Sequence, residues 1–329
     1  MNFPLFQKAL SQSTSTLPVA TLATAALWML FVPSGATGVG ESGNLFWQMV
    51  KWPSFDPRFY RTAAFLLLLV SGYWQTEVSN RYALLNVRSK MPAVCFVCMS
   101  ALCVFLRDLH PALVLMALHG AVLYLLFSVT VKPHTTLQVF KLFGLVSIET
   151  LVYPQAWVLV VAYGACLAYM RFSSMKVFFA ALIGLIVPYW FFFSLTVLID
   201  RQDIFLQQTE SMCLFGWPDF SCWSSTQVIA FAFSSFLFLV SSFHHFRHQR
   251  QEKPRVKMLN NCLCILGYVS LCFVLCCPQD LVQILPLCIV PFAMMAGIYF
   301  AHGDSRGSNV LTMVSVIVWV ALAVLSVCL

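Results

Sequence analysis

Residues 247–257, RHQRQEKPRVK, carry five Lys or Arg and separate two apolar segments, at about 226–246 and about 258–277. A helix of about 20 apolar residues crosses the hydrocarbon core of a bilayer. Cytoplasmic loops of membrane proteins retain an excess of Lys and Arg. The stretch therefore predicts two membrane-spanning helices joined by a basic cytoplasmic loop, and it orients the rest of the chain.

Apolar segments of this kind fill most of the sequence. Of its 329 residues, 60% are hydrophobic and 9% are charged, against about 25% charged in an average globular chain. We therefore predict an all-α transmembrane bundle in which residues 1–329 form a single integral membrane domain. We expect eleven spans, at about 17–33, 59–79, 91–107, 110–130, 136–152, 154–170, 176–199, 226–246, 258–277, 281–301 and 309–328.

The number of spans has one alternative. The segments 136–152 and 154–170 are short and are separated only by Tyr153-Pro154. If these two segments form a re-entrant pair, the chain has ten spans.

Charged residues are sorted between alternate loops. With eleven spans, 14 of the 19 Lys and Arg lie on the side of the basic loop, and 9 of the 12 Asp and Glu lie on the other side. The N-terminus is then cytoplasmic and the C-terminus lies outside. The net charge of +7 follows from this topology and favours contact with anionic lipid headgroups. It therefore does not point to nucleic acid.

Two outer loops, at about 34–58 and 200–225, are longer than the rest and rich in Trp and Phe. Aromatic side chains at this depth anchor at the headgroup level, so we expect short interfacial helices in both loops. Cys213 and Cys222 share the second loop, where a disulfide is one possibility in an oxidising compartment. Most of the other cysteines lie in apolar segments and are expected to pack as small apolar residues.

Polar groups inside a bilayer are costly and are candidate functional residues. His119 lies near the middle of its segment and Glu149 near the outer end of the next one. His119 could relay a proton or contact a substrate, or it could form a structural hydrogen bond with a neighbouring helix. Lys141 precedes Glu149 by two helical turns, about 12 Å along the axis, so these two residues are not expected to pair.

Three further positions are candidates. In the outer turn that contains Arg107 and Asp108, Asp108 either caps the following helix or forms a site that faces the periplasm. Pro188, followed by Tyr189, removes a backbone hydrogen bond and should kink its helix, and the freed carbonyls could line a cavity. Asp56 is an acidic residue in the first outer loop.

His244, His245 and His248 lie together before the basic loop. They lack a clear further metal ligand, so we expect no metal site there but contact with lipid headgroups. We find no phosphate-binding loop, zinc-protease motif, dinucleotide fingerprint or nucleophile elbow. The sequence therefore predicts no cofactor and gives no positive sign of an enzyme.

Part of the sequence resembles an uncharacterised family of multi-pass inner-membrane proteins from Bacteroidota. The resemblance lies between Asn80 and Asp200. It rests on Asn80-Arg81, on Asn86-Val87-Arg88-Ser89-Lys90-Met91-Pro92, on Tyr153-Pro154, and on Arg171–Lys176 followed by Gly184–Phe191. The family has no assigned activity, so the resemblance implies a location in the bacterial inner membrane and no mechanism.

Three functions remain open. The leading hypothesis is a transporter or translocase of a lipid, lipid-linked or small-molecule envelope substrate, because of the number of spans, the expected kink at Pro188 and the few polar groups within the membrane. The second is a membrane enzyme that acts on a polyprenyl-linked glycan with Asp56 at its site. The third is a non-catalytic scaffold that binds other envelope proteins.

Overall fold

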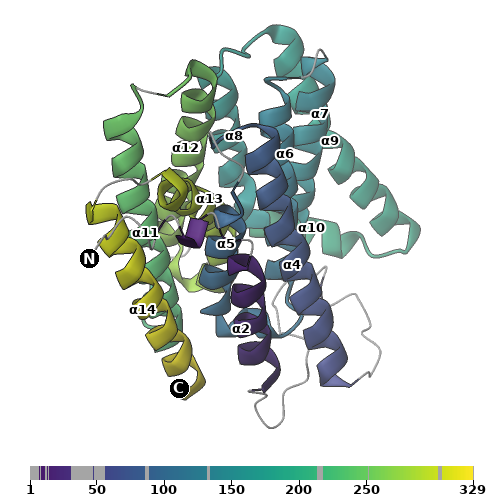
Figure 1. Ribbon diagram of the computed structural model, residues 1–329. Coiled ribbons are helices and arrows are strands. Elements are labelled where there is room, and N and C mark those ends of the chain that lie inside the picture. Colours follow the sequence, from purple (N-terminus) through teal and green to yellow (C-terminus); the bar gives the residue numbers. More distant parts are fainter. Residues whose placement is uncertain are drawn as a thin grey trace.

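The computed structural model describes residues 7, 9–11, 13, 15–30, 47, 56–85, 89–131, 134–212, 218–250, 252–302 and 306–328. These residues form a bundle of α-helices joined by short turns (Figure 1) and include no β-strand. The predicted all-α class is therefore confirmed.

Each of the eleven predicted apolar segments coincides with a helix. The four shortest or most polar are α2 (Thr16–Leu30), α4 (Pro57–Arg81), α5 (Met91–Ala101) and α8 (Trp157–Tyr169). The other seven are α6 (Pro111–Ser128), α7 (Thr135–Val152), α9 (Met175–Leu198), α11 (Ser225–His248), α12 (Pro254–Cys276), α13 (Leu281–His302) and α14 (Arg306–Cys328). Short 3₁₀ turns lie at η1 (Val104–Arg107), η2 (Pro154–Ala156) and η3 (Pro278–Asp280), and a further helix, α10 (Gln202–Ser211), lies in the second long loop.

Seven helices in the described part of the chain are long and apolar enough to cross a membrane: α6, α7, α9, α11, α12, α13 and α14. The chain is therefore a multi-pass membrane protein. Helix α5 has 11 residues and is about 16 Å long, roughly half of the hydrocarbon core. The eleven-span count, the orientation of the termini and an interfacial place for α10 stay predictions.

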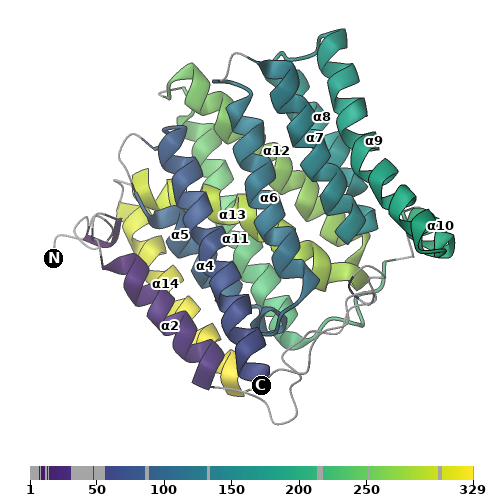
Figure 2. The same ribbon diagram turned by 90° about the vertical axis from the view of Figure 1, so that its right-hand side faces the viewer.

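Helix α13 forms the centre of the bundle (Figures 1 and 2), and 89% of the residues in its most apolar stretch are buried. Gly297 allows its close approach to α5, because a Cβ atom there would lie 2.5 Å from the Pro92 backbone. By contrast, only 22% of the residues in the apolar stretch of α9 are buried, and this helix lies at one edge with Trp190 and Phe191 exposed. Such an apolar, exposed face is typical of a helix that contacts lipid.

Side-chain caps mark the beginnings of several helices. Ser224 and Gln227 form a reciprocal capping box at the start of α11, which satisfies two otherwise unpaired backbone donors. Asp56 accepts a hydrogen bond from the Arg58 backbone and caps α4. The prediction that Asp108 caps α6 is wrong, because the imidazole of His110 takes that position.

Candidate functional site

Three helices bring polar side chains together inside the bundle. His119 on α6 places Nδ1 3.2 Å from Oε1 of Glu149 on α7. The hydroxyl of Tyr163 on α8 lies 3.0 Å from the same His119 nitrogen. All three residues are fully buried. We call these three residues the interior cluster.

The protons of the interior cluster have more than one arrangement. His119 Nδ1 can donate a proton to the Glu149 carboxylate, or it can accept one from the Tyr163 hydroxyl or from a protonated Glu149. Nε2 of His119 and Oε2 of Glu149 have no hydrogen-bond partner among the described residues. Because an unpaired buried polar atom costs about 1–3 kcal/mol, both atoms are places where a proton, water or polar substrate group would be stabilised.

The opposite face of α7 packs tightly against α9. A Cβ atom at Gly184 would lie 2.6 Å from the Phe140 carbonyl oxygen, so only glycine permits this crossing. The Ser147 hydroxyl donates to the Leu185 carbonyl at 2.8 Å, and the Tyr189 hydroxyl donates to Thr150 Oγ1 at 2.8 Å. Tyr189 therefore reaches α7 at Thr150, the residue that follows Glu149.

Pro188 lies inside α9, which continues through it to Leu198. It has no backbone N–H, so the Gly184 carbonyl one turn earlier loses its usual helical donor. The cavities described below are lined by other residues. A cavity beside Pro188 stays a prediction.

A second pair lies where η1 meets the start of α4. Arg61 Nε donates to Asp108 Oδ1 at 2.8 Å. The Arg61 side chain is only 2% exposed, and Arg107 beside it is also buried. The turn between η1 and α6 is thus held to α4 by an ion pair, while Asp56 is exposed and serves as a helix cap.

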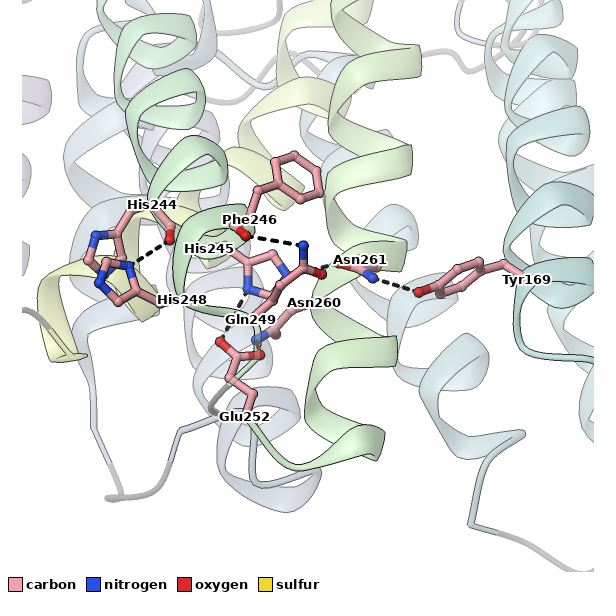
Figure 3. Close-up of polar contacts among 9 residues, drawn as sticks. All are labelled: Tyr169, His244, His245, Phe246, His248, Gln249, Glu252, Asn260 and Asn261. Carbon is pink, nitrogen blue, oxygen red and sulfur yellow. Dashed lines mark hydrogen bonds and ion pairs between the residues drawn. The ribbon is translucent and has the colours of Figure 1, made fainter.

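The ends of α11 and α12 carry a third set of polar contacts (Figure 3). His245 places Nδ1 3.2 Å from Glu252 Oε1 and Nε2 2.8 Å from Asn261 Oδ1. Asn261 in turn donates to the Tyr169 hydroxyl at 2.6 Å, and Asn260 donates to Glu252 Oε2 at 3.2 Å. We call these five residues the end cluster.

The end cluster holds an ion pair. Both nitrogens of His245 face oxygen atoms, an arrangement that favours an imidazole with a proton on each nitrogen. Partial burial raises the pKa of the Glu252 carboxyl, but the bonds from His245 and Asn260 outweigh it and leave this pKa below its usual value.

Three cavities lie beside these helices. One of about 340 Å³ is lined by His244, His248, Lys253, Tyr299 and His302, next to the end cluster. A groove of about 270 Å³ is lined almost entirely by apolar side chains of α2, α5, α11 and α14. The third, about 990 Å³, lies between α7 and α9 near His134 and Lys176. Among the described residues, no group of three His, Cys, Asp or Glu is arranged to hold a metal ion.

The structure groups some of the predicted site residues and separates others. His119 and Glu149 are in contact, whereas Tyr189 bonds Thr150 on another face of α7. Arg107 and Asp108 lie apart from these residues, beside Arg61. Cys222 is exposed, but Cys213 lies outside the described residues, so their disulfide stays a prediction.

Sequence reasoning missed several participants. Tyr163 lies in an apolar helix, where a tyrosine hydroxyl gives no separate signal. Arg61 and Asp108 are 47 residues apart, and no sequence pattern joins them. Glu252 lies among the basic residues of its loop and was not selected. A single acid in such a loop indicates that it pairs with a nearby basic or polar residue.

Comparison of the chain with protein-family models, curated proteins and solved structures finds no match.

Proposed function

We propose that this chain is a proton-coupled transporter or translocase of a lipid or lipid-linked envelope substrate in the bacterial inner membrane. The single observation that carries the proposal is the fully buried His119–Glu149–Tyr163 cluster. Its titratable groups lie on three helices of a multi-pass membrane bundle. In such bundles, interior carboxyl and imidazole groups mark proton relays and substrate pathways.

Stability gives little reason for this pair. Removing a carboxylate and an imidazolium from water costs several kcal/mol for each ion, and well-packed apolar residues often replace a buried pair without loss. A structural pair would also be expected to satisfy all of its polar atoms. Here one atom of each partner has no partner among the described residues, so each atom is open to a proton, a water or a ligand.

The two alternative functions have less support. An enzyme would need an outer groove lined by Asp56, Arg58 and Arg107, but none of the three cavities is lined by them. Asp56 and Asp108 are already engaged in a cap and an ion pair. A scaffold needs no interior titratable pair. Binding of other envelope proteins would therefore accompany a transport function and not replace it.

The test uses purified protein in vesicles of phosphatidylethanolamine and phosphatidylglycerol with a trace of fluorescent phosphatidylglycerol. A pH gradient is imposed, and chemical bleaching of the outer leaflet reports the movement of labelled lipid. We expect the gradient to accelerate this movement with the wild-type protein. Glu149→Gln should abolish the acceleration because it removes the titratable carboxyl.

The matched control is Glu210→Gln, which neutralises an exposed acid on α10 outside the interior cluster. It should behave as the wild type does. Equal rates with wild-type protein, Glu149→Gln and protein-free vesicles would contradict translocation of this lipid class. In cells that lack the gene, profiles of lipids and surface glycans should change and should not be restored by His119→Ala.

A further inference from the structure

The face of α11 changes character along its length. Phe233 and Leu237 line the apolar groove, whereas Ser241, His244 and His248 line the cavity beside the end cluster. These five residues follow one another at intervals of three or four positions, so they share one face of the helix. The groove and the histidine cavity therefore lie along one continuous stripe.

The length of this stripe matches one leaflet of a bilayer. From Phe233 to His248 the helix rises by about 22 Å, at 1.5 Å per residue. Half of a bilayer, with its headgroups, is about 20–22 Å thick. The apolar part lies nearer the middle of α11, and the polar part lies at the end of this helix that precedes the basic loop. This order is the one that a lipid anchored in that leaflet would have.

The groove is suited to an acyl chain that enters from the side. Its lining includes Val19 on α2, Val94 on α5 and Val316 on α14. Val19 is 64% exposed and Val316 is 37% exposed, so the groove is accessible from the surface of the bundle. Figures 1 and 2 show α2 and α14 at its periphery, away from α9.

The cavity at the other end of the stripe offers donors to an anion. His244, His248 and His302 contribute imidazole groups, and Lys253 contributes a fixed positive charge. His248 Nδ1 donates to the His244 carbonyl, which leaves its Nε2 available. Among the described residues that line this cavity, Glu252 is the one acid, and its two oxygens already contact His245 and Asn260. A phosphate would thus meet donors and a positive charge and no free carboxylate.

We propose that the groove and the histidine cavity together form a binding site for one anionic phospholipid of the leaflet next to the basic loop. One acyl chain occupies the groove between α2, α5 and α14. The phosphate lies among Lys253, His302 and His248. This inference goes beyond the proposed function and does not require transport, because a fixed lipid would fill the same site.

The experiment measures lipid binding to the purified full-length protein by native mass spectrometry and by thermal shift. The probes are phosphatidylglycerol, phosphatidylcholine and glycerol phosphate, the last of which has the anionic headgroup without acyl chains. We expect phosphatidylglycerol to bind and to raise the melting temperature, and each of the other two to bind much more weakly. Lys253→Gln should lower the affinity for phosphatidylglycerol about fivefold, which is the loss expected for one basic contact near a membrane surface.

Controls separate this site from general attraction. Lys176→Gln neutralises an exposed lysine that lines the cavity between α7 and α9, and it should leave binding unchanged. Ala23→Phe should fill the groove and reduce binding, whereas Leu22→Phe, at a position that is 70% exposed, should not. Equal binding of phosphatidylglycerol and phosphatidylcholine, or equal loss in Lys253→Gln and Lys176→Gln, would overturn the proposal.

The outcome is independent of the proposed transport. If Lys253→Gln and Ala23→Phe bind lipid normally while gradient-driven movement still depends on Glu149, the lipid site is wrong and the function stands. If lipid binding shows the expected pattern but wild-type protein moves no labelled lipid, the lipid site stands and the proposed transport function is wrong.

Discussion

The interior and end clusters contain the same pair of groups in the same geometry. In each, a histidine Nδ1 lies 3.2 Å from a glutamate oxygen, and a tyrosine belongs to the network. The interior pair is fully buried, while the side chain of Glu252 is 23% exposed. His245 has a partner on both nitrogens, whereas His119 lacks one on Nε2.

The difference indicates that the surroundings of such a pair, rather than the pair itself, set its energetic cost. At the end of the bundle, all atoms of the imidazole ring that can form hydrogen bonds do so, and water can reach the carboxyl. Such a pair fixes α11 against α12 at a modest energetic gain. In the interior, the same pair is fully buried, and two of its atoms have no partner among the described residues. There it is costly to hold and easily changed by a proton or a ligand.

The largest effect should follow from breaking the interior pair. His119→Ala leaves the Glu149 carboxyl buried without its partner, and we expect a loss of about 3–5 kcal/mol in the free energy of unfolding. Unfolding of the purified protein in detergent measures this loss. The double variant His119→Phe with Glu149→Leu should recover most of it. A loss as large in the double variant would mean that packing, not the unpaired carboxyl, is responsible.

The sequence predicts the helices well and the clusters in part. Runs of apolar residues locate all eleven helices, because length and hydropathy are local properties. The same reasoning selects His119 and Glu149, because a polar group in an apolar segment stands out. It does not show that the two meet, since the helix rotations that bring α6, α7 and α8 together depend on packing. Gly184 acquires its role only from Phe140, which is distant in sequence, whereas the His110 cap is local and was missed because Asp is a more usual capping residue than His.

A smaller effect is expected at the end cluster. His245→Ala removes the imidazole that bonds Glu252 and Asn261, and hydrogen bonds to charged groups contribute about 1.5–3 kcal/mol each before exposure is considered. Because water can replace part of the interaction at Glu252, we expect a loss at the lower end of this range, measured by the same unfolding assay. If His245→Ala cost as much as His119→Ala, the distinction between the two clusters would fail.

The two tyrosines allow a finer comparison. Tyr163→Phe removes a fully buried hydroxyl from His119 Nδ1 and should cost about 0.5–1.5 kcal/mol. Tyr169→Phe removes the equivalent hydroxyl from Asn261, but Tyr169 is 45% exposed, so water can bond the amide instead. Its unfolding free energy should stay close to that of the wild type. A larger loss in Tyr169→Phe than in Tyr163→Phe would contradict the assigned role of burial.

The smallest effect is a dependence on pH that belongs to the end cluster. The pKa of the Glu252 carboxyl is lowered in the folded protein by its bonds to His245 and Asn260, which outweigh the effect of burial. A carboxyl whose pKa is lowered on folding stabilises the folded state at pH values above its pKa in the unfolded chain, about 4.3 for Glu. This contribution is lost as the pH falls through the pKa in the folded protein. The difference in unfolding free energy between wild type and Glu252→Gln should therefore shrink as the pH falls below about 4. Glu210→Gln, which removes an exposed carboxyl on α10, should show no such change relative to the wild type. A difference that grew as the solution became more acidic would mean that Glu252 is not held as a carboxylate by His245.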